Sequence, residues 1–122
     1  MIYEDLLTVP FKVNGRDASG MDCYGLVLEL CNRCGKKLKD LIVCENECAP
    51  ENSFQTYAEN INVALIDTPK KYCLFQYTEN ELLHIGFMLD ERTAINMTTK
   101  GVRVWPLEII KHKDDFKFME II

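Results

Sequence analysis

Apolar positions recur at helical spacing in the first third of the chain. Asp22, a residue type that favours helix N-termini, precedes them, and Gly35, a common helix stop, follows them. The pattern predicts one helix between these two residues, with the loop-like segment 15–20 in front of it. Cys23 would then lie in the first turn of this helix. The apolar positions that define the spacing are Leu26, Leu30, Cys31 and Cys34.

Short apolar and aromatic runs, separated by polar turns, dominate the second half of the chain. Between the two halves, residues 36–53 are polar, and residues 54–66 are expected to form a helix that leads toward Pro69. A helical first half and a strand-rich second half predict an α+β fold, with N-terminal helices packed on an antiparallel β-sheet. The expected strands cover residues 72–77, 82–89, 93–97, 102–107 and 116–122.

Length and composition favour a single folded unit. The chain has 122 residues, of which 48% are hydrophobic, so it can bury one core and leaves little length for a second. We therefore expect one domain over residues 1–122. The sequence shows neither internal repeats nor low-complexity segments.

Charge and hydropathy argue against two classes of partner. The 14 basic and 19 acidic side chains give a net charge of -5, which offers no basic surface for nucleic acid. Residues 1–15 lack the charged start and apolar run of a secretory signal, and no apolar run approaches the roughly 20 residues that cross a bilayer. We expect a soluble protein, made in the cytoplasm, that binds neither nucleic acid nor a membrane.

Cys23 is the candidate nucleophile. A thiol in the first turn of a helix meets unpaired backbone N–H groups and the positive end of the helix dipole, and both favour the thiolate. A base must then carry a proton to the leaving group, and the chain offers His84 and His112. His112 lies in a charged segment with no motif around it, so His84 is the better candidate.

Asn96 can complete the site if the chain turns back correctly after His84. A hairpin centred on Asp90, with a loop of three or five residues, puts His84 and Asn96 on one face of the sheet, whereas a two-residue turn puts them on opposite faces. In the first case the amide can hold the imidazole in its working tautomer. Spacing alone remains weak evidence, because a cysteine on a helix and a histidine on a strand are usually packing residues.

The local sequences around these residues resemble motifs of the NlpC family of cell-wall cysteine peptidases. The segment 10–27 contains Asp-Cys-x-Gly-Leu-Val after an apolar entry and a glycine turn, as in the nucleophile segment of that family. The run His-Ile-Gly-Phe-Met-Leu at 84–89 is similar to the histidine strand, and residues 94–97 and 101–104 are similar to the two strands that follow.

The resemblance implies a papain-like core and a function. Cys23 would be the nucleophile, His84 the general base and acid, and Asn96 the residue that orients His84. The reaction would be amide-bond cleavage in peptidoglycan stem peptides, of the γ-D-glutamyl endopeptidase type, through a thioester on Cys23. No cofactor and no metal are implied.

Three positions depart from the family pattern. Phe11 stands where many members have a tyrosine whose hydroxyl helps to stabilise the oxyanion, and loss of one such donor costs on the order of 10²-fold in rate. Asn96 replaces a frequent histidine and brings no charge. Tyr24 replaces a frequent serine and is expected to change the pocket wall.

The remaining cysteines and Trp105 are interpreted as structural. Cys-x2-Cys-x9-Cys-x3-Cys spacing resembles a zinc site, but two of these cysteines continue the inward face of the predicted helix, which favours packing over metal binding. Cys73 is expected in the core, and Trp105 is expected to pack more than to line a cleft. The four spaced cysteines are Cys31, Cys34, Cys44 and Cys48.

Three functional hypotheses remain open. The leading one is a cell-wall endopeptidase similar to the phage-tail branch of the family, with peptidoglycan stem peptides as substrate and phage tail-tip proteins as partners. The second is a tail-assembly or binding module that keeps the fold and has lost activity, which Phe11 favours. The third is an amidase or acyltransferase that acts on another substrate.

Overall fold

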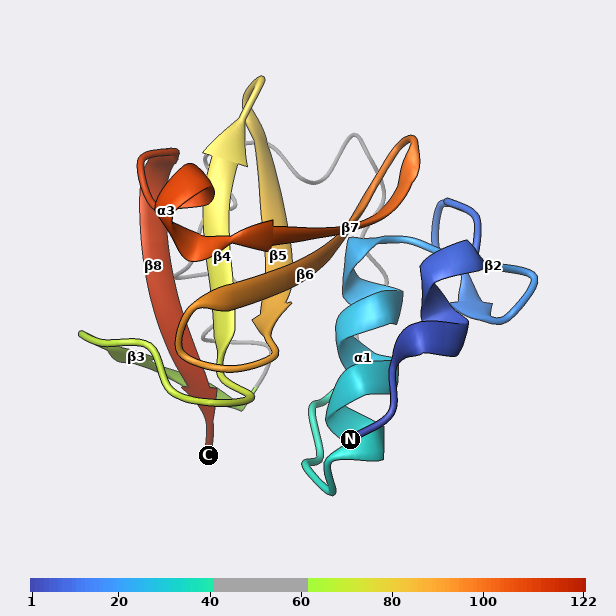
Figure 1. The fold of residues 1–122 in the computed structure, drawn as a ribbon, viewed down its shortest axis with the longest axis horizontal. Helices are drawn as coiled ribbons and strands as arrows, with labels where there is room; N and C mark the ends of the chain where they lie inside the picture. Colours follow the sequence, from blue (N-terminus) through green and yellow to red (C-terminus); the bar gives the residue numbers. More distant parts are fainter. Residues whose placement is uncertain (41–61) are drawn as a thin grey trace.

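The computed structural model describes residues 1–40 and 62–122, and shows an α+β fold (Figure 1). Within these ranges no helix is long and apolar enough to cross a membrane. The elements in chain order are the 3-10 helix η1 (Glu4–Thr8), β1 (Arg16–Asp17), β2 (Gly20–Met21), α1 (Cys23–Arg33), β3 (Val63–Ile66), β4 (Leu74–Glu79), β5 (Leu82–Met88), β6 (Thr93–Thr98), β7 (Gly101–Pro106), α3 (Leu107–Ile110) and β8 (Asp114–Ile121).

Helix α1 begins and ends where the sequence predicts, because local capping chemistry fixes both ends. Asp22 is the N-cap, and its side chain accepts a hydrogen bond from the Gly25 N–H at 2.7 Å. At the other end Gly35 adopts a positive φ of 79°, which glycine tolerates well. The Gly35 N–H donates to Asn32 O and the Lys36 N–H donates to Cys31 O, the pair of bonds that closes a Schellman motif.

The larger sheet has six strands in the order β3-β8-β4-β5-β6-β7, and every neighbouring pair is antiparallel. Each of the five predicted strand segments contributes one strand to it. Strand β3 corrects the helix expected over 54–66, because Val63–Ile66 pairs with the C-terminal strand β8. Pairing with a strand so distant in sequence overrides the local pattern, and residues 54–61 lie outside the described part of the chain.

Strands β5 and β6 are paired only near their connecting loop. The pairs are Phe87–Ile95 and Met88–Ala94, and the strands then separate. Strands β6 and β7 cross β4 and β5 obliquely (Figure 1). The start of β5 and the end of β6 therefore border an opening, and the candidate site residues lie around it.

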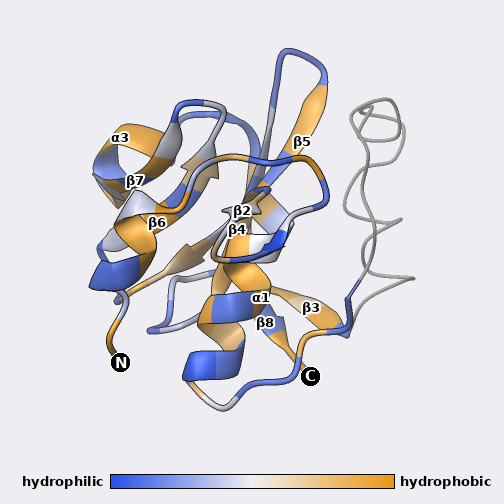
Figure 2. Cartoon of the chain, turned by 90° about the vertical axis from the view of Figure 1, so that its right-hand side faces the viewer, coloured by the Kyte–Doolittle hydropathy of each residue, from blue (hydrophilic) through white to orange (hydrophobic). Residues whose placement is uncertain are grey.

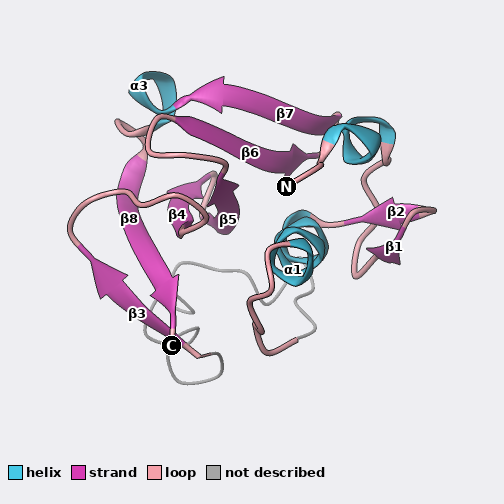
Figure 3. Cartoon of the chain, turned by 60° about the horizontal axis from the view of Figure 1, so that its bottom comes forward, coloured by secondary structure: helices cyan, strands magenta, loops and turns pink. Residues whose placement is uncertain are grey.

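Helix α1 packs on one face of the sheet, mainly against β5 and β6 (Figure 3). Residues 1–40 hold this single α-helix and the short η1, and residues 54–61 of the second predicted helix lie outside the described ranges. Figure 2 shows apolar residues along α1 and along the strands beside it. The helix buries Tyr24, Gly25, Leu26, Val27, Leu30 and Cys31.

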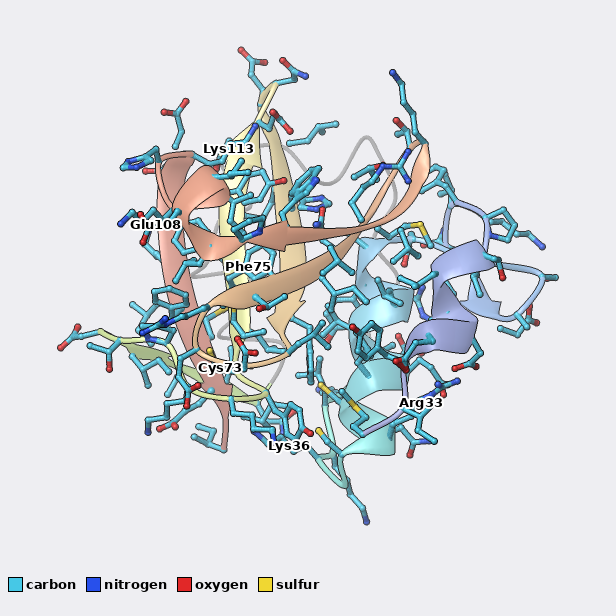
Figure 4. The ribbon with its side chains drawn as sticks, in the orientation of Figure 1. Arg33, Lys36, Cys73, Phe75, Glu108 and Lys113 are labelled. Atoms are coloured by element: carbon cyan, nitrogen blue, oxygen red, sulfur yellow. The ribbon has the colours of Figure 1, made fainter. Side chains whose placement is uncertain are left out.

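A second hydrophobic cluster forms around the other face of β4. Figure 4 labels two members of this cluster: Cys73, which directly precedes β4, and Phe75, which lies within it. Cys73 is 1% exposed, so its predicted place in the core is confirmed. The buried members of the cluster are Cys73, Phe75, Tyr77, Met88, Ala94 and Ile110.

The N-terminal segment is tied to both ends of α1. Arg33 in its last turn donates to both carboxylate oxygens of Asp5, at 2.6 and 2.8 Å. Near its first turn, Phe11 forms an isolated bridge with Met21, next to the hydrogen bond from the Lys12 N–H to Met21 O. These contacts bring Phe11 beside the start of α1.

Candidate active site

A pocket of about 290 Å³ lies where the start of α1 meets the open ends of β4, β5 and β6. Cys23 and His84 both line it, and Phe11 forms part of its wall. The structure therefore brings the predicted nucleophile and the predicted base to one cavity, although they are 61 positions apart in the sequence. Asn96 lies behind His84, buried at 0% exposure.

Asp22 fixes the position of Cys23 through its carboxylate. The carboxylate accepts three hydrogen bonds, from the Gly25 N–H at 2.7 Å, the Asn14 N–H at 3.0 Å and Arg16 Nη1 at 2.8 Å. Together they join the loop before the helix to its first turn. Cys23 is the first residue of α1 and is half-buried, so its thiol meets the positive end of the helix dipole.

A glycine is required at position 25, two residues after Cys23, because the backbone of Gly15 passes too close for a side chain. A Cβ at this position would overlap the carbonyl oxygen of Gly15. The same carbonyl accepts a hydrogen bond from Arg16 Nη1 at 2.8 Å, so it cannot move away freely. This contact explains the glycine in the Asp-Cys-x-Gly sequence in physical terms.

His84 and Asn96 are in direct contact, with 2.9 Å between Nε2 and Oδ1. The hairpin that joins their strands has Asp90–Arg92 as its loop, closed by the Leu89 N–H donating to Thr93 O. Its register is centred on Glu91, one residue later than predicted, because Phe87 pairs with Ile95. This shift keeps both side chains on one face, but makes them diagonal neighbours rather than directly opposed.

The hydrogen bonds of Asn96 determine the tautomer of His84. Asn96 Nδ2 donates to Arg103 O at 3.4 Å, so Oδ1 is the atom that faces the imidazole. Since Oδ1 only accepts, Nε2 must carry the proton of the neutral ring. Nδ1 is then the nitrogen with a lone pair, which can accept a proton.

The surroundings of His84 keep it neutral near pH 7. Burial is the largest effect and lowers the pKa of His84 below its ordinary value of 6.5, with a smaller lowering from Lys113. The hydrogen bond to Asn96 and the charge of Glu79 raise the pKa of His84 in opposition. A neutral imidazole with an available Nδ1 is the form that serves as a base.

Tyr77 is a pocket residue that the sequence reasoning missed. It is the direct cross-strand partner of His84, and the two rings are 4.9 Å apart at 44°. A signal was present at Asn80 and Glu81, which form a two-residue turn with positive φ values of 51° and 64°. Asn favours such turns, and a two-residue hairpin there fixes the Tyr77–His84 pairing.

Glu79 is a second missed residue, at the rim of the pocket. It lines the cavity and accepts from Lys113 Nζ at 2.6 Å. Lys113 lies at the same end of β4 and β8 (Figure 4). The ion pair reduces the negative charge that Glu79 presents to the pocket.

Of two aromatic predictions, the one for Tyr24 is wrong and the packing expected for Trp105 is confirmed. Tyr24 does not line the pocket: its ring is fully buried, and its hydroxyl donates to Lys39 O. Its ring belongs to the hydrophobic core cluster with Leu26 and Leu30, so the expectation that it changes the pocket wall is wrong. Trp105 packs against the second cluster and also lines the pocket, so it does both of the things considered for it.

The described cysteines other than Cys23 occupy structural positions. Cys31 is buried, which raises the pKa of its thiol to about 12, and burial also raises the pKa of Cys73. Cys34 donates from Sγ to Cys31 O at 3.4 Å. Residues 1–40 and 62–122 contain no group of three or more side chains that could hold a metal ion, and Cys44 and Cys48 lie outside these ranges.

The arrangement can support nucleophilic catalysis. A thiol at a helix N-terminus and a neutral imidazole oriented by a buried amide share one cavity, which are the parts that acyl transfer needs. No protein-family model and no curated protein match the chain. The geometry of this pocket and the sequence motifs around it are therefore the features that indicate a function.

Proposed function

We propose that the chain is a cysteine peptidase of the NlpC type, with a papain-like core, that cleaves amide bonds in bacterial peptidoglycan stem peptides. The observation that carries the proposal is the 2.9 Å hydrogen bond between His84 and Asn96 in a pocket that Cys23 also lines. The motif around Cys23 supports it, because Asp22 and Gly25 have structural reasons to flank a helix-terminal thiol.

The proposed reaction begins with proton transfer from the Cys23 thiol to Nδ1 of His84. The thiolate attacks the carbonyl carbon of the scissile amide, and the carbonyl π electrons move to oxygen. When the intermediate collapses, the C–N bond breaks and the leaving amine takes the proton from the imidazolium. Water then gives a proton to Nδ1 and attacks the thioester, which releases the acid and restores Cys23. Asn96 holds the ring in one tautomer throughout.

The γ-D-glutamyl stem peptide is the substrate that the NlpC resemblance implies. A pocket of about 290 Å³ is near the lower end of the range for small-molecule sites, and suits one or two residues of a peptide. Its walls are largely apolar, with Phe11, Leu82 and Met97 among them. The binding cleft would extend from this pocket along the substrate.

Digestion of purified peptidoglycan tests the proposal. Wild type and the variants Cys23→Ala and Cys34→Ala are incubated with the wall, and new amino groups are identified by mass spectrometry. Release by wild type and Cys34→Ala, with none by Cys23→Ala, supports the peptidase. Equal release by the wild type and both variants contradicts it. Rapid alkylation of Cys23 without wall cleavage indicates an amidase or acyltransferase with another substrate.

A second candidate function is a phage tail-assembly or binding module of the same fold. The observation that favours it is Phe11, which lines the pocket but has no hydroxyl to donate to an oxyanion. Its partners would be tail-tip proteins. Absence of wall cleavage together with absence of Cys23 labelling by a mild alkylating reagent at neutral pH supports this module over the enzyme.

A further inference from the structure

Tyr77 is a buried residue whose hydroxyl takes no part in the mechanism proposed above. Tyr77 is only 2% exposed, and within residues 1–40 and 62–122 its hydroxyl has no hydrogen-bond partner. The completely buried unpartnered side-chain atoms of this part of the chain are Asn14 Oδ1 and Gln76 Oε1, so Tyr77 Oη keeps some contact with solvent. Since Tyr77 lines the pocket, that contact is with the pocket.

The ring of Tyr77 is held in place from several sides. It lies 4.9 Å from the ring of His84, stacks on Phe116 at 6.4 Å and lies under Lys113 Nζ at 5.7 Å. A ring fixed in this way presents its hydroxyl in one position. Fixed donors stabilise developing charge better than mobile ones, because they do not reorganise during the reaction.

Tyr77 and Cys23 line the same pocket, and the Tyr77 hydroxyl remains protonated. Burial is the main reason that the pKa of Tyr77 is raised well above its ordinary value, and the charges of Glu79 and Cys23 raise it further. Tyr77 is therefore a hydrogen-bond donor over the whole pH range in which His84 works as a base.

Other side chains in the pocket are less suited to this task. Phe11 has no donor, and Thr98 Oγ1 already donates to Gly101 O at 2.8 Å. Asn80 is exposed at the tip of a turn. Tyr77 is thus the pocket side chain that combines burial, a fixed ring and an unpartnered donor.

We infer that the Tyr77 hydroxyl donates a hydrogen bond to the oxyanion that forms when the Cys23 thiolate adds to a carbonyl carbon. The bond from sulfur to carbon forms as the carbonyl π electrons move to oxygen, and this oxygen accepts from Tyr77. On collapse the electrons return to the carbonyl and the leaving group departs. The inference rests on the proposed nucleophilic role of Cys23.

Two reagents separate this role from a merely structural one. p-Nitrophenyl acetate acylates a thiol through an oxyanion and releases p-nitrophenolate, whereas iodoacetamide alkylates it by displacement of iodide without an oxyanion. Both rates at Cys23 are measured by peptide mass spectrometry in wild type and Tyr77→Phe. We expect Tyr77→Phe to slow acylation by on the order of 10²-fold and to leave alkylation unchanged.

Tyr72→Phe is the matched control, because Tyr72 stacks on Phe87 at 5.7 Å and does not line the pocket. It should change neither rate. Unchanged acylation in Tyr77→Phe, or an equal fall in both rates, overturns the inference while the role of Cys23 stands. Labelling of Cys23 in wild type no faster than that of the half-buried Cys34 overturns the proposed function and the inference together.

Discussion

Nε2 of His84 and Oδ1 of Asn96 lie 2.9 Å apart on two strands that are paired only at Phe87–Ile95 and Met88–Ala94. The contact therefore forms where the strands have already begun to separate. A side-chain hydrogen bond takes the place of the missing backbone pairs at this point. The tautomer of His84 therefore depends on how far β5 and β6 have separated at this point.

Asn96→Ala should lower activity and change its pH dependence. The hydrogen bond from Nε2–H favours the protonated imidazole, so its loss lowers the pKa of His84 further and moves the acid limb of kcat/KM to lower pH. Loss of the fixed tautomer should reduce the plateau value of kcat/KM by on the order of 10²-fold. A pH–rate profile of wild type and variant checks both effects, and an acid limb that moves upward contradicts the account.

Gly25→Ala should destabilise the fold and misplace Cys23. The added Cβ would overlap Gly15 O, and such overpacking costs about 1–3 kcal/mol. Gly35→Ala is the control, because its φ of 79° is strained for alanine although a Cβ there has no neighbour within 4 Å. Denaturant unfolding should show a lower free energy of unfolding for both variants than for wild type. Alkylation of Cys23 should slow only in Gly25→Ala, and equal alkylation rates would refute the positional role of Gly25.

The ends of α1 were predictable because they depend on nearby residues. Asp22 and Gly35 fix the helix through bonds that span a few positions. The shared face of His84 and Asn96 was predictable for a similar reason, since an odd-numbered hairpin loop decides it. The exact register was not, because Glu91 and Asp90 are equally acceptable centres for such a loop.

The missed features depend on contacts between distant segments. Strand β3 exists because Val63–Ile66 pairs with β8, which follows it by about 50 residues. Tyr24 is a core residue because it joins the same hydrophobic cluster as Leu74 and Phe87 on distant strands. Short-range spacing carries little information on such contacts. Tyr77 differs, because the turn at Asn80 and Glu81 that sets its pairing with His84 is local.

Stability should depend on pH through His84. Burial lowers the folded-state pKa of His84 below its ordinary value of 6.5, so the unfolded chain binds more protons between these two values. The free energy of unfolding should therefore rise with pH up to about 6.5 and level off above it. His84→Gln should remove this contribution, whereas the exposed His112→Gln should retain it. Denaturant unfolding at pH 5 and pH 7.5 measures the difference, and an identical pH dependence in both variants contradicts the assignment.

Phe11 and Tyr77 should be coupled in a double-mutant cycle, because both line the pocket beside Cys23. Phe11→Tyr alone should change the rate of acylation by less than about threefold, since Tyr77 already supplies a donor. In the Tyr77→Phe background, Phe11→Tyr should raise the rate of acylation about 10-fold. If Phe11→Tyr changed the acylation rate by the same factor in both backgrounds, the two positions would act independently and the predicted coupling would be wrong.

The pH profile of Cys23 alkylation tests the central claim, that the thiol of Cys23 and the imidazole of His84 act as one unit. Iodoacetamide labelling of Cys23 is followed by mass spectrometry from pH 5 to pH 10 in wild type and His84→Ala. The account predicts rapid labelling near pH 7 in wild type, and in the variant a fall to the rate of an ordinary thiol, which reacts rapidly only above its pKa of about 8.5. Superimposable profiles for the two proteins would contradict it.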